Sequence, residues 1–561
     1  MWLLGQLCAG CSNGATGGSR DAAPTQQVPA DPCAGVTCSG HGTCVSLGAE
    51  VRCECESGYV PLGLECVVAQ VYWVSPEGAA GWAQCKSDAP LAGAAACSLA
   101  TANASAAAGD TVILRGGTYA GSTIAPGKSG ASVAAPIVFA GYAPEVVRFS
   151  ASSCGIKLVN KSYVTVRGVG FFDMGLFFTI EGGHGNEIGH CDFDGRSADS
   201  GSWQGARIYA YSDTGEGSTH NWIHHCTFQH WAYGAYDEHR GGLLDLGRAL
   251  EEGDDSWHNL IEHNAFAYGG HHTLGVYSKY NVIRGNYIHN ETNAANWDFE
   301  GYRGAITEGP SGGWCLYEGN RFAYSGGSGL ALRTPHNIVR FNMFYRHASG
   351  GIQVVASEAG ADHADHNRIF HNTFYRNGHE SDYSGFACGL YFSNWGDVDP
   401  VGNVVKNNIF FDNSNGSVCY DGTFPRPEVV GNWDDNSRDP GFVDLSGTDP
   451  NTSALPDFHL VAGSVAADAG APLTTIAGGG GTSNAFVVAD AGYFTNGWEM
   501  APGDLVQLAG QTETARILDV DYGTNTITVD RTLTFAAGQG VSLAYVGAAP
   551  DLGAFEIGAG Q

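Results

Sequence analysis

An eight-residue pattern, Asn-x-(Ile/Val)-x-x-Asn-x-(Phe/Ile), recurs through the middle of the chain and limits the fold more than any other feature. Five copies keep both asparagines; they begin at Asn259, Asn281, Asn337, Asn367 and Asn403. Three copies keep part of the pattern and begin at Asn186, Asn221 and Cys315; the first two carry Cys191 and Cys226 at the second Asn position. The starts lie 22 to 38 residues apart, and self-similarity at such a period indicates a solenoid.

Each copy alternates apolar and polar residues, which is the periodicity of a β-strand. The shorter spacings match about one coil of a right-handed parallel β-helix, and the longer ones leave room for loop insertions. The second Asn of each copy is expected to hold a turn that needs left-handed φ and to stack on its neighbours. The 82 glycines among 561 residues have no collagen-like period and fit many tight corners. We therefore predict an all-β chain, with a right-handed parallel β-helix over residues 71–470.

A second series of short alternating strands precedes the asparagine copies and gives a register. One set of side chains is predicted to point inward: Ile208, Leu246, Val276, Leu332, Val354 and Phe392. The other set is predicted to point outward in one column: Tyr211, Tyr277, Thr307, Arg333, Val355 and Ser393. A polymer bound along the solenoid would meet this outward column.

The composition favours an exported protein that does not bind nucleic acid. The formal net charge of −30 repels polyanions at long range, and sixteen cysteines indicate an oxidising compartment. The start, MWLLGQLCAGC, resembles a bacterial lipoprotein cleavage box with Cys11 as the lipidated residue, and a polar tether follows it through residue 32. A truncated secretory signal is the alternative. We expect a monomer that is secreted, or anchored at the bacterial cell surface or outer membrane through this segment only.

Residues 33–67 contain six cysteines with the spacing C-x4-C-x5-C-x8-C-x-C-x10-C. This spacing resembles an EGF-like module. The resemblance implies the pairs Cys33–Cys44, Cys38–Cys53 and Cys55–Cys66, whereas six cysteines alone allow 15 connectivities. The acidic pair of calcium-binding members is missing before the first cysteine, so no calcium is expected here, and a spacer role is favoured.

The segment from Val71 resembles the N-terminal cap and first coils of bacterial β-helix polysaccharide lyases and their relatives. It includes VYWVSPEG, GDTVILRGGTY and PIVFAGY, with an Ala-rich stretch at residues 98–108 that predicts a short capping helix. Cys85 and Cys97 bracket a loop here and are expected to pair. Cys388 and Cys419 lie one coil apart, and either a bridge or two free buried thiols would fit their positions.

The C-terminal part is predicted to close the solenoid around an inserted domain. Residues 458–470 resemble the closing coil of the same family, and PDLGAFE, residues 550–556, resembles its last strand within a closing segment at residues 547–561. Between them, alternating segments in residues 483–546 predict a small antiparallel β-barrel or sandwich. A cap and a carbohydrate-binding accessory are both open as its role.

The densest polar cluster of the chain lies between Tyr236 and His347. Its candidate site residues are Asp245, Arg248, His271, His272, Tyr277, Lys279, Arg303, Glu308, Arg333 and His336. Residues 279–346 contain seven Lys/Arg and five Asp/Glu, a net charge of +2, whereas residues 347–470 contain five and seventeen, a net charge of −12. An acidic polysaccharide could dock on such a locally positive strip.

The chemistry that fits this cluster is β-elimination on a uronic acid. An Arg fork can neutralise the sugar carboxylate, and a base of tuned pKa can remove the proton on the adjoining ring carbon. Ser278-Lys279-x-Asn281 is similar to the Ser-Lys-Ser-x-x-Asn stretch of the chondroitinase B-type and alginate lyases, and the resemblance implies Lys279 as the base. In that family an Arg follows about one coil later, whereas here Glu308 holds that place and Arg333 lies a coil further.

This interpretation gives each candidate a role. Arg333 would neutralise the carboxylate, Lys279 would remove the proton, and Tyr277 would protonate the leaving oxygen. A histidine, His271 or His272, would be the substitute base. Substrate contacts would come from Asp245, Arg248, Arg303, Glu308 and His336, with Asp245 or Glu308 also orienting the cations.

Two other functions suit parts of the sequence. A glycoside hydrolase would use Asp245 and Glu308 as acid and base. A cell-surface adhesion or carbohydrate-binding protein would suit the EGF-like spacer and the solenoid, and acidic loops at residues 362–366, 397–399 and 434–439 could bind Ca²⁺ through oxygen ligands. No other cofactor or metal is expected. The ionisable cluster favours an enzyme, and its polysaccharide substrate is left open.

Overall fold

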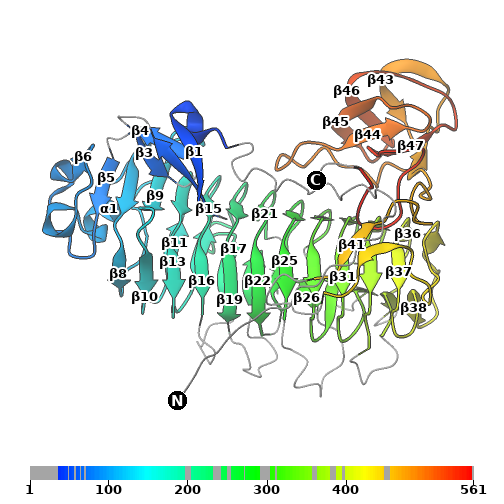
Figure 1. The fold of residues 1–561 in the computed structure, drawn as a ribbon, viewed down its shortest axis with the longest axis horizontal. Helices are drawn as coiled ribbons and strands as arrows, with labels where there is room; N and C mark the ends of the chain where they lie inside the picture. Colours follow the sequence, from blue (N-terminus) through cyan, green and yellow to red (C-terminus); the bar gives the residue numbers. More distant parts are fainter. Residues whose placement is uncertain are drawn as a thin grey trace, which may run out of the picture.

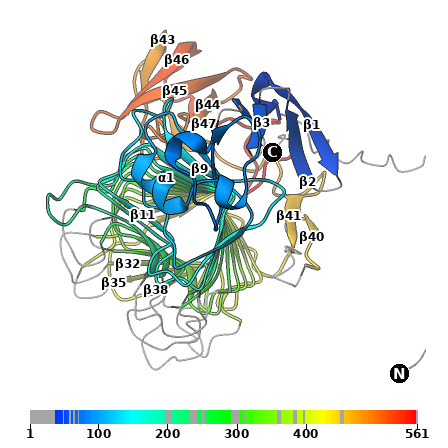
Figure 2. The same ribbon diagram turned by 90° about the vertical axis from the view of Figure 1, so that its left-hand side faces the viewer.

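The protein is a stack of coils whose strands form three long parallel sheets around one core (Figures 1 and 2). The computed structural model describes residues 36–47, 50–55, 59–62, 65–68, 71–195, 204–231, 242–248, 254–270, 272–290, 304–309, 312–356, 363–379, 387–394, 398–447 and 455–558. Each coil adds one strand to each sheet in turn. The fold is the right-handed parallel β-helix that the repeats predict. In the described part, no helix is both long and apolar enough to cross a membrane.

The sheets are numbered here in the order in which a coil enters them. Sheet 1 contains β6 (Lys86–Ser87), β5 (Val71–Val74), β7 (Thr111–Leu114), β9 (Ile137–Gly141), β12 (Val164–Arg167), β15 (Glu187–Gly189), β18 (Trp222–His224), β21 (Leu260–Glu262), β24 (Val282–Arg284), β27 (Leu316–Glu318), β30 (Ile338–Arg340), β33 (Arg368–Phe370), β36 (Val404–Lys406) and β39 (Glu428–Val430). Sheet 2 contains β8 (Gly117–Ala120), β10 (Val147–Ser150), β13 (Gly170–Phe172), β16 (Asp192–Asp194), β19 (Thr227–Trp231), β22 (Ala265–Gly269), β25 (Tyr287–His289), β28 (Arg321–Ala323), β31 (Met343–Tyr345), β34 (Thr373–Tyr375) and β37 (Ile409–Phe411). Sheet 3 contains β11 (Ile156–Val159), β14 (Phe178–Glu181), β17 (Gln204–Tyr209), β20 (Gly242–Leu246), β23 (Leu274–Val276), β26 (Gly304–Glu308), β29 (Ser328–Leu332), β32 (Ile352–Ala356), β35 (Leu390–Asn394) and β38 (Val418–Asp421).

The parallel register places like residues on top of one another along the core. Phe193 pairs with Phe228, and Phe228 with Phe266, in consecutive strands of sheet 2. Their rings stack with centroids 4.7 and 4.8 Å apart. An aromatic pair of this kind contributes about 0.5–1.5 kcal/mol beyond its buried area, so the repeated Phe of the octamer stabilises the stack of coils.

The asparagines form the ladders that the repeat predicts, but the left-handed residue is a different one. Asn264 is buried, and its Nδ2 donates to Asn286 Oδ1 at 3.1 Å. The residue before it, His263, carries the positive φ of +53°. Asn407 precedes Asn408 in the same way, with φ +55°. The buried Asn is therefore selected by its amide ladder, because such a group must be hydrogen-bonded, and the preceding position makes the turn.

The inward set on sheet 3 is confirmed, since all six of its predicted residues are fully buried. Of the predicted outward column, Tyr277, Arg333, Val355 and Ser393 share one register position, and the other two members do not. Thr307 pairs with Gly275, two residues before Tyr277. Ile208 pairs with Leu246 and Leu246 with Val276, so Tyr209, and not Tyr211, lies in the column of Tyr277.

The N-terminal module consists of two antiparallel pairs, β1 (Gly42–Leu47) with β2 (Glu50–Cys55) and β3 (Tyr59–Leu62) with β4 (Glu65–Val68). The predicted bridge Cys38–Cys53 is present. Cys44 and Cys66 are also disulfide-bonded, whereas Cys11 and Cys33 lie outside the described residues, as does the side chain of Cys55. The EGF-like assignment stays a prediction.

The start of the solenoid is capped as expected. The helix α1 (Leu99–Ser105) covers the core end, and Ser98 Oγ accepts from the Thr101 N–H at 3.1 Å as its N-cap. The predicted bridge Cys85–Cys97 is present, and Cys388 and Cys419 are also bonded. Disulfides of this kind persist in oxidising compartments, which agrees with an exported protein.

The C-terminal region differs from the prediction in its closing elements. β40 (Phe442–Asp444) and β41 (Asp457–Leu460) pair antiparallel, so residues 458–470 do not form a further parallel coil. An antiparallel sheet follows, in the order β42 (Thr474–Thr475), β47 (Gly540–Leu543), β44 (Leu505–Leu508), β45 (Thr514–Asp521), β46 (Thr526–Phe535) and β43 (Gly481–Val487). Residues 550–556 are not a strand; their backbone is held instead by single bonds such as Ala554 N–H to Thr373 Oγ1 at 3.1 Å.

Candidate functional site

Asp245 and His272 form a buried pair on the outer face of sheet 3. Asp245 lies in β20 at an outward position, and His272 lies just before β23 of the next coil. His272 Nε2 donates to Asp245 Oδ1 at 2.8 Å, and the two side chains are 7% and 1% exposed. Because an ionised carboxylate can only accept, the ring nitrogen that faces Asp245 carries a proton. This is the arrangement that orients a histidine base.

Tyr277 lies beside this pair, and three glycines lie against these side chains. A Cβ on Gly275 would come within 2.4 Å of the Tyr277 ring and 2.6 Å of Asp245 Oδ1, and one on Gly309 would come within 2.2 Å of the ring. A Cβ on Gly242 would lie 2.6 Å from His272 Nε2. Three consecutive coils therefore lack a side chain where the ionisable groups need the space. The rings of His272 and Tyr277 are 6.3 Å apart, edge to face.

Tyr209 and Arg248 complete the described part of the cluster. The Tyr209 hydroxyl donates to Asp245 Oδ2 at 3.3 Å, and the Arg248 guanidinium lies 5.6 Å from the centre of the Tyr209 ring. Burial, reinforced by the Asp245 carboxylate, raises the pKa of Tyr209, so its hydroxyl stays protonated. Tyr209 was missed at the sequence level because alternation alone did not separate it from Tyr211, two residues later.

Lys279 and Arg333 lie just past strand ends of the same sheet. Lys279 is half-buried in the turn after β23, and no hydrogen bond or ion pair joins it to another described residue. Arg333 follows β29 and is also half-buried. Val276 pairs with Glu308, so Tyr277 is level with Gly309, and Arg333 is one coil beyond it. Coils about 4.8 Å apart put Tyr277 and Arg333 roughly 10 Å apart.

Glu308 cannot contact a substrate on the surface, which corrects its predicted role. It occupies an inward position of β26, paired with Val276, and is fully buried. Tyr317 donates to its Oε1 at 2.6 Å, and Thr334 donates to its Oε2 from Oγ1 at 2.7 Å and from N at 3.0 Å. Burial is the largest effect and raises the pKa of Glu308 to about 7, although these hydrogen bonds oppose it. The hydrolase scheme with Asp245 and Glu308 as acid and base is therefore excluded.

The locally positive strip is not one surface. Arg284 lies in β24 of sheet 1 and pairs with Glu262 at 2.6 Å. Arg340 lies in β30 of the same sheet and pairs with Glu318 at 2.7 Å and with Asp504 at 2.5 Å. Arg321 belongs to β28 of sheet 2. The cations that are close in sequence therefore face different sides of the solenoid, since each coil passes through three sheets.

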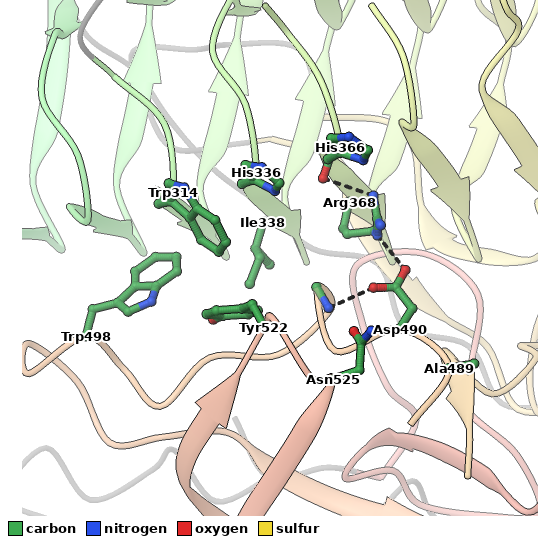
Figure 3. A pocket seen from close by; sticks show the side chains of 11 residues that line it. Trp314, His336, Ile338, His366, Arg368, Ala489, Asp490, Trp498, Tyr522 and Asn525 are labelled. Carbon is green, nitrogen blue, oxygen red and sulfur yellow. Dashed lines mark hydrogen bonds and ion pairs between the residues drawn. The ribbon is translucent and has the colours of Figure 1, made fainter. Parts of the chain in front are cut away.

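His336 belongs to a second site, a cavity of about 360 Å³ between the solenoid and the C-terminal sheet. Trp314, His336 and His366 line it from the solenoid, and Trp498 and Tyr522 line it from the C-terminal domain (Figure 3). The Trp314 ring stacks on His336 at 4.3 Å and lies 4.7 Å from Tyr522. Burial, followed by repulsion from His366 and Arg368, lowers the pKa of His336 to about 4, so the ring is neutral at pH 7.

Three residues that line the cavity, Trp314, His336 and His366, belong to a ladder of stacked rings along the corner between sheet 3 and sheet 1. Its rings stack in consecutive coils at distances from 4.3 to 6.2 Å: His220, His258, Tyr280, Trp314, His336 and His366. All six residues have positive φ. This ladder could have been found in the sequence, because each of its six residues directly precedes the first residue of an octamer. Only His336 was named as a candidate. His271 and Arg303 lie outside the described residues.

The match to a family model agrees with the fold. Residues 214–454 match the family model described as right handed beta helix region. A pectate lyase structure is 16% identical with a TM-score of 0.44, covering 87% of this chain and 96% of that one. A mannuronic acid specific polysaccharide family 6 lyase from human gut microbiota is 16% identical, with a TM-score of 0.40 and coverage of 58% and 75%. A surface adhesin of Streptococcus pneumoniae is 12% identical, with a TM-score of 0.31 and coverage of 59% and 86%. No curated protein matches. Likenesses this distant assign no activity.

Proposed function

We propose that this protein is an exported polysaccharide lyase that cleaves a uronate polymer on the outer face of sheet 3. The observation that carries the proposal is the Asp245–His272 pair, a 2.8 Å hydrogen bond held almost out of solvent beside Tyr277. Buried ionisable pairs of this kind cluster at functional sites. A purely adhesive surface has no need of a histidine that a buried carboxylate holds in one orientation.

The geometry changes the order of the candidate bases. His272 is held in one orientation by Asp245, whereas Lys279 makes no hydrogen bond or ion pair with another described residue that would fix its position. We therefore assign proton removal to His272 and keep Lys279 as the alternative. The C–H bond next to the sugar carboxylate breaks, its electrons form the ring double bond, and the glycosidic C–O bond breaks. Tyr277 gives its proton to the leaving oxygen, and Arg333 neutralises the carboxylate.

The test is an assay for the ultraviolet absorbance of unsaturated uronate, with alginate, glycosaminoglycans and pectin as substrates. His272→Ala and Tyr277→Phe should each lower kcat by at least about a hundredfold, since general acid–base groups contribute about 10²–10⁴-fold. His263→Ala, an exposed histidine at a different corner, is the matched control and should keep full activity. Lys279→Ala, compared with His272→Ala, separates the two base assignments, and Arg333→Ala tests neutralisation of the carboxylate. If the wild type cleaves a polymer and the His272, Tyr277 and Arg333 variants cleave it equally well, the site is wrong.

The aromatic cavity favours a second function, carbohydrate binding without cleavage. Aromatic faces with a few polar groups are typical of ligand sites, and Arg368 and Asp490 supply such groups, joined by a 2.8 Å ion pair at the wall of the cavity. Trp314→Ala should then weaken binding of a polysaccharide at least tenfold, measured by affinity electrophoresis. A protein that binds the polymers but releases no unsaturated product would support this function alone.

The location at the cell surface is also a proposal. We propose that Cys11 carries a lipid anchor and that the tether and EGF-like module hold the solenoid away from the membrane. Palmitate labelling of the wild type that is lost in Cys11→Ala would support the anchor, and an unlabelled wild type would contradict it.

A further inference from the structure

Three histidines meet at the corner between sheets 1 and 2, away from the site on sheet 3. His190 follows β15, His224 ends β18, and His225 follows it. One ring nitrogen from each lies within 4.8 Å of the other two. His190 and His225 are exposed and have φ +53° and +52°, while His224 is buried. The stacking of coils thus joins residues 35 positions apart.

In this cluster one His224 ring nitrogen lies close to a nitrogen of His225, and the other lies close to a carboxylate. His224 Nδ1 and His225 Nδ1 are 3.0 Å apart. His224 Nε2 lies 3.0 Å from Glu187 Oε1. Arg167 holds the same carboxylate with two bonds, Nε to Oε1 at 2.7 Å and Nη2 to Oε2 at 2.9 Å. Glu187 is therefore ionised and accepts from His224 Nε2–H, which leaves the lone pair of His224 on Nδ1, pointing at His225.

Two further contacts fix His224 in place. Its ring stacks on Trp222 at 3.8 Å. It also lies over Gly189, where a Cβ would come within 2.5 Å of the ring. The result is a histidine whose Nδ1 faces His225 and whose Nε2 is held by a carboxylate. Metal-binding histidines are held in this way, because a carboxylate on the second nitrogen fixes the tautomer and makes the ligand more basic.

We propose that His190, His224 and His225 bind a late first-row divalent cation such as Zn²⁺, with Glu187 as the group that positions His224. Zn–N bonds of about 2.0–2.1 Å put two ligand nitrogens about 3.3 Å apart in a tetrahedral site. The 3.0 Å pair is close to that value, and rotation of the exposed His190 ring brings the third nitrogen in. Three imidazoles favour Zn²⁺, Cu²⁺ or Ni²⁺ over Ca²⁺ and Mg²⁺, which take oxygen ligands.

The proposed ion would join two consecutive coils and leave one coordination position open to solvent. Cys191 and Cys226 follow His190 and His225 directly, but both thiols are buried, and Cys226 Sγ donates inside the turn to the His224 carbonyl at 3.2 Å. The site is therefore expected to use nitrogen alone. His263 is the next residue of the same column, with φ +53° and its ring 5.2 Å from that of His225. It stands outside the cluster and offers a matched control.

The experiment is titration of the chelator-treated full chain with Zn²⁺ by calorimetry and with Co²⁺ by absorption spectroscopy. Expected results are one Zn²⁺ site per chain and a Co²⁺ spectrum of tetrahedral type without thiolate charge-transfer bands. His190→Asn and His225→Asn should weaken Zn²⁺ at least tenfold, since Asn tolerates left-handed φ, and Glu187→Gln should weaken it about 10–100-fold. His263→Asn should bind as the wild type does.

Two outcomes overturn the proposal. A wild type that shows no saturable Zn²⁺ binding means that the short contact is a histidine–histidine hydrogen bond only. Equal affinity in the wild type, His190→Asn and His225→Asn means that the ion binds elsewhere. The far-UV spectrum of each variant shows whether it has folded. A Zn²⁺-dependent rise in melting temperature shows that the ion binds the folded state, because binding to the native state alone raises stability.

Discussion

The buried Glu308 gives the sharpest test of the register, through the substitution Glu308→Gln. Its Oε2 accepts from the Thr334 and Arg333 N–H groups at 3.0 and 2.9 Å and from Thr334 Oγ1 at 2.7 Å. Its Oε1 lies 2.6 Å from the Tyr317 hydroxyl. A protonated Glu308 can keep these contacts by donating from Oε1 to Tyr317. A Gln places its amide group in the same position, so the variant imitates the acid and removes the titration.

The magnitude follows from the pKa of Glu308, which burial raises from 4.5 to about 7. Between these values the folded state holds a proton that the unfolded state has lost, so stability falls as the pH rises. A full shift of this size corresponds to about 3 kcal/mol. Of this, about 2 kcal/mol is lost between pH 5.5 and pH 8, a range that avoids precipitation near the pI of about 4.8.

The assay is denaturant unfolding of wild type and variant at both pH values. The free energy of unfolding of Glu308→Gln relative to wild type should rise by about 2 kcal/mol from pH 5.5 to pH 8. This difference removes the contribution of the histidines, which titrate in both proteins. Glu513→Gln, at an exposed position, is the control and should show no such change. A difference between Glu308→Gln and wild type that is independent of pH would refute the inward position of Glu308.

Three further predictions concern packing, the domain contact and the site. Leu332→Ala, at a fully buried position, should lower the free energy of unfolding by about 2–5 kcal/mol, and a neutral effect would mean that the register is shifted. Arg340→Ala leaves the buried Asp504 without its ion-pair partner. The free energy of opening that hydrogen exchange measures in β44 and β45 should therefore fall by about 3–5 kcal/mol. Unchanged protection would contradict the contact. Gly309→Ala pushes against the Tyr277 ring and should lower turnover at least about tenfold with little change in melting temperature, whereas Gly478→Ala, which meets open space, should be silent.

The coils were predictable from the sequence because their signal is local and repeated. Each octamer carries its own alternation, most carry the ladder Asn and the stacked Phe, and the copies that keep the pattern correct those that depart from it. Alternation identified Leu332 and Val354 as inward, and both are fully buried. The closing segments carry no repeat, so residues 550–556 were predicted as a strand from resemblance alone, and they are not one.

The site was harder to predict because it depends on neighbours from different coils. Alternation with Thr307 outward puts Glu308 inward, but Glu308 was named as a substrate contact because it lies in the polar cluster and an inward position was expected to be apolar. The partners that make a buried carboxylate acceptable, Tyr317 and Thr334, lie 9 and 26 residues away. Asp245 and His272 were each named, but their pairing across 27 residues needs the exact length of one coil. Loop insertions hide that length.

Both accessory modules contact sheet 1, and the proposed lyase site lies on sheet 3. Arg167 of β12 reaches Glu65 of the N-terminal module at 3.3 Å, and Arg340 of β30 holds Asp504 of the C-terminal sheet. Both contacts lie on sheet 1, and Figures 1 and 2 show both modules on that side of the solenoid. The corner from sheet 3 to sheet 1 carries Arg333 and, three residues later, His336 in the aromatic cavity. If the proposed function is correct, a polymer bound at His272 would be long enough to reach the cavity over this corner, whereas a single sugar would not. Cleavage at one end and binding at the other would then act on the same chain.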